Sequence, residues 1–117
     1  MTIQQSNIPI LELNPTNELR LIFKRCHNYI YGNQGLPKDR AFHELLKIIF
    51  CKVQDERTTQ ISFYVDTGKN LELEQNHLKK RIQTIFEQVK KSHPNTFRKD
   101  EKIELDNRVL SFIVSEL

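Results

Sequence analysis

Apolar residues recur every three or four positions in four separate stretches of the chain. Residues with that spacing share one face of an α-helix, so each stretch predicts an amphipathic helix. The second is the most densely apolar, with an arc from Ala41 to Val53 that covers about half of the helix circumference. Such an arc predicts a central helix that contacts several neighbours. The predicted helices span residues 15–31, 37–56, 75–91 and 106–117.

Residues that favour helix ends flank these stretches. Pro15 and Pro37 suit first helical positions, and Asp106 suits an N-cap. Gly32 is expected just past the end of the first helix, in a left-handed conformation. The last helix reaches Leu117 without a C-cap, and this predicts that it continues in a longer protein.

Residues 57–74 follow a different pattern, because Ile61, Phe63 and Val65 alternate with polar neighbours and turn residues follow. Alternation is typical of a strand, so a short β-hairpin or an extended excursion is expected near 60–74. The loop 92–105 carries apolar side chains expected to fill the core: Phe97, Ile103 and Leu105. The predicted fold is a mostly all-α bundle of about four helices over residues 15–117, preceded by a tail at 1–14.

Composition narrows the class of protein. The chain has 117 residues, of which 38% are hydrophobic and 28% charged, as in an ordinary globular domain. It has no apolar run near the ~20 residues of a membrane span, and its first residues do not resemble a signal peptide. Two cysteines cannot form a disulfide scaffold, so a cytoplasmic protein without membrane contact is expected.

Motifs of the common enzyme classes are missing. Three scattered glycines cannot build a phosphate-binding loop, and no zinc-protease or paired-cysteine motif is present. Cys26, His27, His43 and Cys51 are the residue types of a zinc site, but their spacing is wrong. Cys26 falls on the apolar face of its helix and Cys51 on the polar side of another. No metal site and no catalytic residue are therefore predicted.

Polar residues gather where the first helix meets the second. His27, Asn28 and Tyr31 are the kind of side chains found in active sites, but no nucleophile or partner carboxylate accompanies them. A structural role in the turn is the favoured interpretation. The residues assigned to this structural turn are Asn28, Tyr31, Asn33 and Gly35.

The strongest charge signal lies between His77 and Lys102, where eight basic and three acidic residues give a net charge of +5. The whole chain carries only +3. Clustered lysine and arginine side chains are what phosphate contacts require, although a solvated helix face has the same appearance. The candidates for DNA contact are Lys79, Lys80, Arg81, Lys90 and Lys91.

The stretch RCHNYIYGNQGLPKDRAFHELLKIIFCKVQDE, Arg25–Glu56, resembles the N-terminal helical domain of N6-adenine DNA methyltransferases. These are the modification subunits of type I restriction systems and their relatives, whose openings read H-N-x-I-Y-x-N-x-G-L and then A-F-x-E-L-L-K-x-x-F-x-K. Residues 81–91 and 97–117 are also similar to the family.

The resemblance implies a non-catalytic domain that packs on its own catalytic domain, helps to enclose DNA and takes part in assembly with specificity and restriction subunits. The catalytic domain of such a parent enzyme binds S-adenosylmethionine through a glycine-rich motif and holds the flipped adenine with N-P-P-F/Y. Neither motif occurs in this chain, so no cofactor is expected in it. The alternatives are a stand-alone basic nucleic-acid-binding module and a protein-interaction module that docks through the last helix.

Overall fold

The structure is a computed structural model that describes residues 15–58, 61–68 and 70–117. Over these residues the chain forms four α-helices and no strand, which confirms the predicted small all-α bundle. The predicted tail at 1–14 lies outside the described residues. None of the described helices is long and apolar enough to cross a membrane. The helices are α2 (Pro15–Gln34), α3 (Lys38–Glu56), α4 (Leu71–Ser92) and α5 (Asn107–Glu116).

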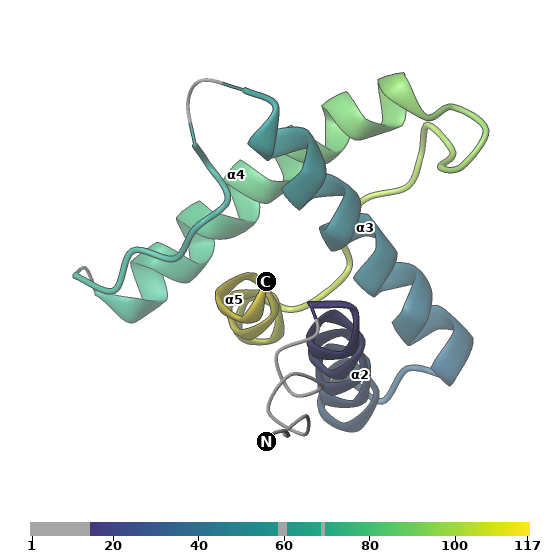
Figure 1. Cartoon of the computed structure of the whole chain (residues 1–117). Helices are drawn as coiled ribbons and strands as arrows, with labels where there is room; N and C mark the ends of the chain where they lie inside the picture. Colours follow the sequence, from purple (N-terminus) through teal and green to yellow (C-terminus); the bar gives the residue numbers. More distant parts are fainter. Residues whose placement is uncertain (1–14, 59–60, 69) are drawn as a thin grey trace, which may run out of the picture.

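The four helices close a ring in which each packs against two others (Figure 1). α3 crosses α4 on one side, and α2 and α5 lie side by side on the other. α3 contacts α2, and α5 contacts α4, so the core lies between the two layers. Asp106 caps α5 as predicted, because its carboxylate accepts a hydrogen bond from the backbone N–H of Val109 at 2.8 Å.

The segment between α4 and α5 contributes to the core although it has no regular structure. Phe97, Ile103 and Leu105 are buried, as predicted. The Phe97 ring meets the rings of Phe50 and Phe86 edge-on, with centroids 5.2 Å apart in both pairs. Since such aromatic contacts add to the hydrophobic stabilisation, the segment is fixed firmly against α3 and α4.

Of the two alternatives expected near 60–74, a hairpin or an extended excursion, the residues described there form no hairpin. Residues 61–66 are extended without strand pairing, and Leu71 and Leu73 belong to the first turn of α4. Asn70 caps that turn by accepting a hydrogen bond from the backbone N–H of Leu73 at 3.2 Å. Acidic residues in the first turn also favour the helix, so cap chemistry overrides the alternating pattern.

The end of the first helix also differs from the expectation. α2 continues through Gly32 to Gln34, and the glycine in the left-handed conformation is Gly35, with φ of 67°. The side-chain amide of Asn33 donates to the carbonyl of Tyr29 at 2.9 Å, which satisfies one of the last carbonyls of the helix. The positive φ is thus needed three residues later than predicted.

Cys51 is fully buried and not on a polar side of α3. Glu44, Ile48, Cys51 and Asp55 follow one another at intervals of four, three and four residues, so they form a single stripe. α4 packs on this stripe and buries it. The Cys51 thiol, for example, lies 3.8 Å from the carbonyl oxygen of Ile82 on α4. The prediction failed because it treated the two acidic residues of the stripe as solvent-exposed.

Candidate functional site

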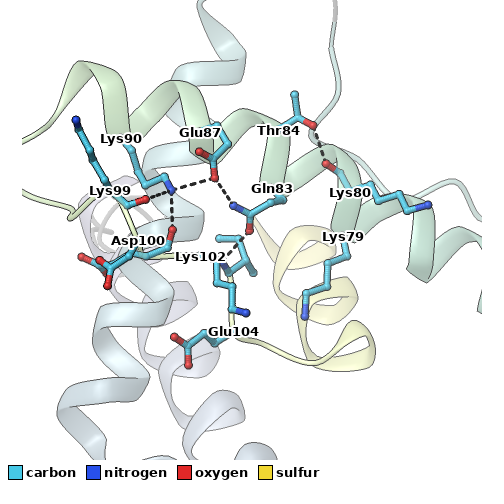
Figure 2. Close-up of a pocket in the computed structure, with 12 residues that line it drawn as sticks. Lys79, Lys80, Gln83, Thr84, Glu87, Lys90, Lys99, Asp100, Lys102 and Glu104 are labelled. Carbon is cyan, nitrogen blue, oxygen red and sulfur yellow. Dashed lines mark hydrogen bonds and ion pairs between the residues drawn. The ribbon is translucent and has the colours of Figure 1, made fainter.

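An open groove of about 1000 Å³ lies between α4 and the segment that follows Phe97 (Figure 2). Its lining contains five lysines, some from each wall, and four carboxylates. The groove therefore carries charges of both signs and is not a uniform basic surface. The lining residues are Lys79, Lys80, Gln83, Thr84, Glu87, Lys90, Lys99, Asp100, Glu101, Lys102, Ile103 and Glu104.

Two of the predicted DNA-contact lysines are bound within the fold. The ammonium of Lys79 donates to the carbonyl of Leu105 at 2.7 Å. The ammonium of Lys90 donates to the carbonyls of Lys99 and Glu101 at 2.8 and 2.7 Å. It also lies 3.0 Å from the carboxylate of Glu87. Both lysines tie α4 to the segment 97–105.

Arg81 is likewise committed to the structure. Its guanidinium pairs with the buried carboxylate of Glu74 at 2.7 Å and donates to the carbonyl of Tyr64 at 2.8 Å. The guanidinium also lies over the Tyr64 ring, 4.4 Å from its centroid. A buried carboxylate needs such a partner, so Arg81 holds the extended residues 61–66 against α4.

Lys80 and Lys91 are the two DNA-contact candidates left with exposed side chains. They lie eleven residues apart on α4, which puts them on the same side of the helix and roughly 16 Å apart along its axis. Glu87 lies between them in sequence, and its carboxylate accepts hydrogen bonds from Lys90 and Gln83. The hydrogen bond from Lys90 is the largest of the influences that keep the pKa of Glu87 below its usual value.

The side chains that hold the far wall of the groove come from the α2–α3 pair, and we call them the polar clamp. Gln34 donates to the carbonyl of Glu104 and accepts from the backbone N–H of Asp106. Glu44 accepts from the backbone N–H of Glu104 at 3.0 Å. These bonds replace the strand or helix pairing that the segment 98–106 lacks. The polar clamp consists of Gln34, Arg40, His43, Glu44 and Lys47.

Lys47 is the centre of the polar clamp and is only 2% exposed. Its ammonium lies 2.5 Å from the carboxylate of Glu44, 3.7 Å from that of Glu101, and donates to the carbonyl of Lys102 at 2.8 Å. Sequence reasoning missed this residue. The signal that could have found it is the Glu44–Lys47 pair three residues apart, directly beside the apolar positions of α3.

Glu101 links the polar clamp to the groove. Its carboxylate lies 2.7 Å from the imidazole of His43 and accepts from the backbone N–H of Arg98 at 2.8 Å. Burial alone would raise the pKa of Glu101. The bonds from Arg98 and His43, together with the charges of His43 and Lys47, outweigh burial and lower it.

The predicted turn residues lie at the junction of α2 and α3. Asn28 and Tyr31 are exposed on α2, while Asn33 and Gly35 form its end. The polar contact across the junction comes from His27, whose Nε2 lies 2.9 Å from the carbonyl oxygen of Lys38. The structure therefore places no acid–base pair at this turn among the residues it describes.

α3 carries a second apolar stripe on the side that faces away from its buried residues. Phe42 is 52% exposed and Val53 44% exposed, Leu46 between them is partly exposed, and Ile49 packs in part against the core. The spacing of four, three and four residues forms a straight ridge, opposite Ile48 and Cys51 on the helix. An apolar ridge rimmed by polar residues is typical of a protein-binding surface. We call Phe42, Leu46, Ile49 and Val53 the α3 stripe.

The last helix is not such a surface. Val109, Leu110, Ile113 and Val114 of α5 are all buried, and Leu117 packs against the core. The expectation that a partner docks on the apolar face of this helix is therefore wrong, because α2 and α4 already cover it.

The thiols and acids do not form a reactive centre in the described part of the chain. Burial, followed by the charge of Glu116, raises the pKa of Cys26 to about 11, and burial raises that of Cys51 further. Neither thiol is ionised at neutral pH. No group of three or more His, Cys, Asp or Glu side chains in residues 15–58, 61–68 and 70–117 could hold a metal ion. No protein-family model, curated protein or solved structure matches this chain.

Proposed function

We propose that this chain is the non-catalytic N-terminal helical domain of a site-specific adenine-N6 DNA methyltransferase of a restriction-modification system. In this role it packs on the catalytic domain of its own polypeptide, assists DNA enclosure and takes part in subunit assembly. S-adenosylmethionine and the flipped adenine are bound by the catalytic domain. The observation that carries the proposal is the exposed apolar surface of the α3 stripe, at Phe42 and Val53 above all, within the segment that resembles this family.

The matching positions divide between two tasks on α3. Glu44 and Lys47 belong to the resemblance, and they hold the segment 98–106 through the polar clamp. Phe42 and Leu46 also belong to it, and they lie on the exposed stripe. A stripe of apolar side chains in water is unfavourable unless another surface covers it, which supports packing against a further domain.

Direct DNA contact is the smaller part of the proposal. Lys79, Arg81 and Lys90 each donate to groups inside the fold, so Lys80 and Lys91 are the candidates with exposed side chains that can reach phosphates. Two lysines with a carboxylate between them produce little of the positive potential that duplex binding needs. The geometry therefore supports domain packing and assembly more strongly than a stand-alone nucleic-acid-binding module.

The test is to express the complete open reading frame that contains this chain and to measure methyl transfer from S-adenosylmethionine to adenine N6 in DNA. We expect activity from the complete product and no binding of S-adenosylmethionine by residues 1–117 in calorimetry. In the complete product, Phe42→Glu with Val53→Glu should lower activity or dissociate subunits. Leu21→Glu, at an exposed apolar residue of α2, should not.

Two results would overturn the proposal. One is micromolar binding of S-adenosylmethionine to residues 1–117 alone, which would place a cofactor site within this chain. The other is a reading frame that encodes no cofactor motif and no N-P-P-F/Y motif.

A further inference from the structure

A second hollow, of about 570 Å³, lies where α4 ends and the chain turns toward the segment 97–105. Phe97 and Pro94 supply its apolar part, and three lysines with one glutamate surround them. It adjoins the groove of Figure 2, with which it shares Glu87, Lys90 and Lys99. The volume falls within the range of roughly 300–1000 Å³ that is usual for ligand sites. We call it the α4-end pocket, and its lining residues are Glu87, Lys90, Lys91, Pro94, Phe97 and Lys99.

Two of its lysines are not neutralised. Glu87 pairs with Lys90, so these two charges cancel. Lys91 and Lys99 are exposed, and their ammonium groups make no hydrogen bond or ion pair with another described residue. The pocket as a whole carries three lysines against one glutamate, a net charge of +2. Charge complementarity therefore calls for an anionic occupant.

The apolar part of the pocket is rigid. The backbone N–H groups of Thr96 and Phe97 both donate to the carbonyl of His93, at 3.0 and 3.2 Å. The Phe97 ring is fixed by Phe50 and Phe86, and the His93 ring meets Phe50 edge-on at 5.0 Å. A site that is already ordered loses little conformational entropy when a ligand binds.

The same packing disfavours a nucleic acid. Binding of single-stranded DNA or RNA relies on bases that stack on open aromatic faces. Phe97 is only 2% exposed, so neither face of its ring is open to a base. The exposed Pro94 instead suits one aliphatic side chain, and the methylene groups of the lysines extend that surface.

We propose that the α4-end pocket binds an acidic peptide segment of a partner protein, with one apolar side chain against Pro94 and carboxylates paired with Lys91 and Lys99. This inference goes beyond the proposed function and does not depend on it, because it concerns a different surface from the α3 stripe; Lys91 is shared with the proposed DNA contacts, and the peptide would compete with DNA for it. The complete product of the gene could methylate DNA whether or not this pocket is used.

The experiment measures fluorescence anisotropy of a labelled eight-residue peptide that carries four glutamates around a central leucine, with the chain titrated in. We expect saturable binding that is lost when glutamines replace the glutamates and weakened when alanine replaces the leucine. Two exposed ion pairs are worth roughly a factor of 2 to 30 in affinity. Lys91→Glu with Lys99→Glu adds repulsion, so this variant should bind roughly tenfold more weakly or worse.

A matched control changes the same charge elsewhere. Lys24→Glu with Lys38→Glu, at two exposed lysines outside the pocket, should leave the affinity within about twofold. Pro94→Asp tests the apolar contact at an exposed residue and should weaken binding without loss of helical circular dichroism. An oligo-dT strand of eight nucleotides that binds more tightly than the peptide would overturn the proposal. No peptide binding at 1 mM, or equal loss in both double variants, would overturn it too.

Discussion

Replacement of Lys47 by methionine is the sharpest test of how the fold holds together. Methionine has nearly the length and apolar volume of the lysine stem, so the change removes the charge and leaves the packing. The carboxylate of Glu44, which is 3% exposed, then loses its cation, and the carbonyl of Lys102 loses its donor. An ionised carboxylate left unpaired in the interior is strongly unfavourable.

The expected loss follows from this burial. Removing one partner of a buried ion pair costs about 3–5 kcal/mol, against a total of about 5–15 kcal/mol for a domain of this size. Lys47→Met should therefore lower the midpoint of thermal unfolding by roughly 10–25 °C. Replacing Glu44 by glutamine as well removes the unpaired charge and keeps an oxygen for the N–H of Glu104. The double variant should be about 1–2 kcal/mol more stable than Lys47→Met alone.

Urea unfolding followed by far-ultraviolet circular dichroism measures these differences. The matched control is Lys52→Met, which removes a lysine of the same helix from an exposed pair with Glu56 at 3.4 Å. That pair should contribute at most about 0.5 kcal/mol. The reasoning fails if Lys47→Met costs no more than Lys52→Met, or if adding Glu44→Gln brings no recovery.

Three further predictions concern other parts of the molecule. Gly32→Ala lies within α2 and has open space at the new Cβ, so it should stabilise the protein by about 0.5–1 kcal/mol. Gly35→Ala, at φ of 67°, should instead destabilise it by about 1–2 kcal/mol. Urea unfolding would contradict this if both variants changed the free energy of unfolding in the same direction. The pKa of Glu101 is lowered in the folded state, so its ionised form stabilises the fold above the unfolded-state pKa, and this contribution is lost as pH falls through the lower folded value. Below about pH 4.5 the free energy of unfolding should therefore fall less steeply in Glu101→Gln than in the wild type. Equal pH dependence of the two proteins would count against this. With Lys80 and Lys91 as the exposed candidates, a log–log plot of duplex affinity against salt should have a slope no steeper than about −2. A steeper slope would mean that Lys79, Arg81 or Lys90 also contacts phosphates.

The helices and most of the core could be predicted because periodicity and caps are local. Asp106 was found from its cap chemistry, and the buried Phe97, Ile103 and Leu105 from their apolar side chains within a polar loop. The first turn of α4 was missed because two signals conflict in it. Leu71 and Leu73 alternate as in a strand, but Asn70 and the acidic first turn satisfy the free N–H groups of a helix.

The buried charges could not be predicted from a pattern that counts every ionisable residue as polar. Glu44 and Asp55 lie on the same stripe as Ile48 and Cys51, so the spacing alone would have placed them inside. Their burial depends on partners that come from distant segments. Asp55 accepts from the backbone N–H groups of Ser62 and Phe63, and Glu44 from that of Glu104.

The candidate DNA-contact residues show the same limit of sequence patterns, because their hydrogen bonds also depend on distant segments. A net charge of +5 over 26 residues gives the excess of basic side chains, but it does not show which groups their N–H donors bind. The segment 97–105 has no helix or strand to satisfy its carbonyls, so lysines of α4 donate to them. Each hydrogen bond made in this way leaves the lysine one donor fewer for a phosphate.

The two faces of α3 have different roles. One face is buried against α4 and carries the acids and the lysine that anchor the loops. The opposite face leaves Phe42 and Val53 about half exposed to solvent. Polar replacements on that face would cost the isolated fold little, so Phe42→Glu should leave unfolding in urea within about 0.5 kcal/mol. If such a variant unfolds the domain instead, the α3 stripe is part of its stability and the proposed docking role loses its support.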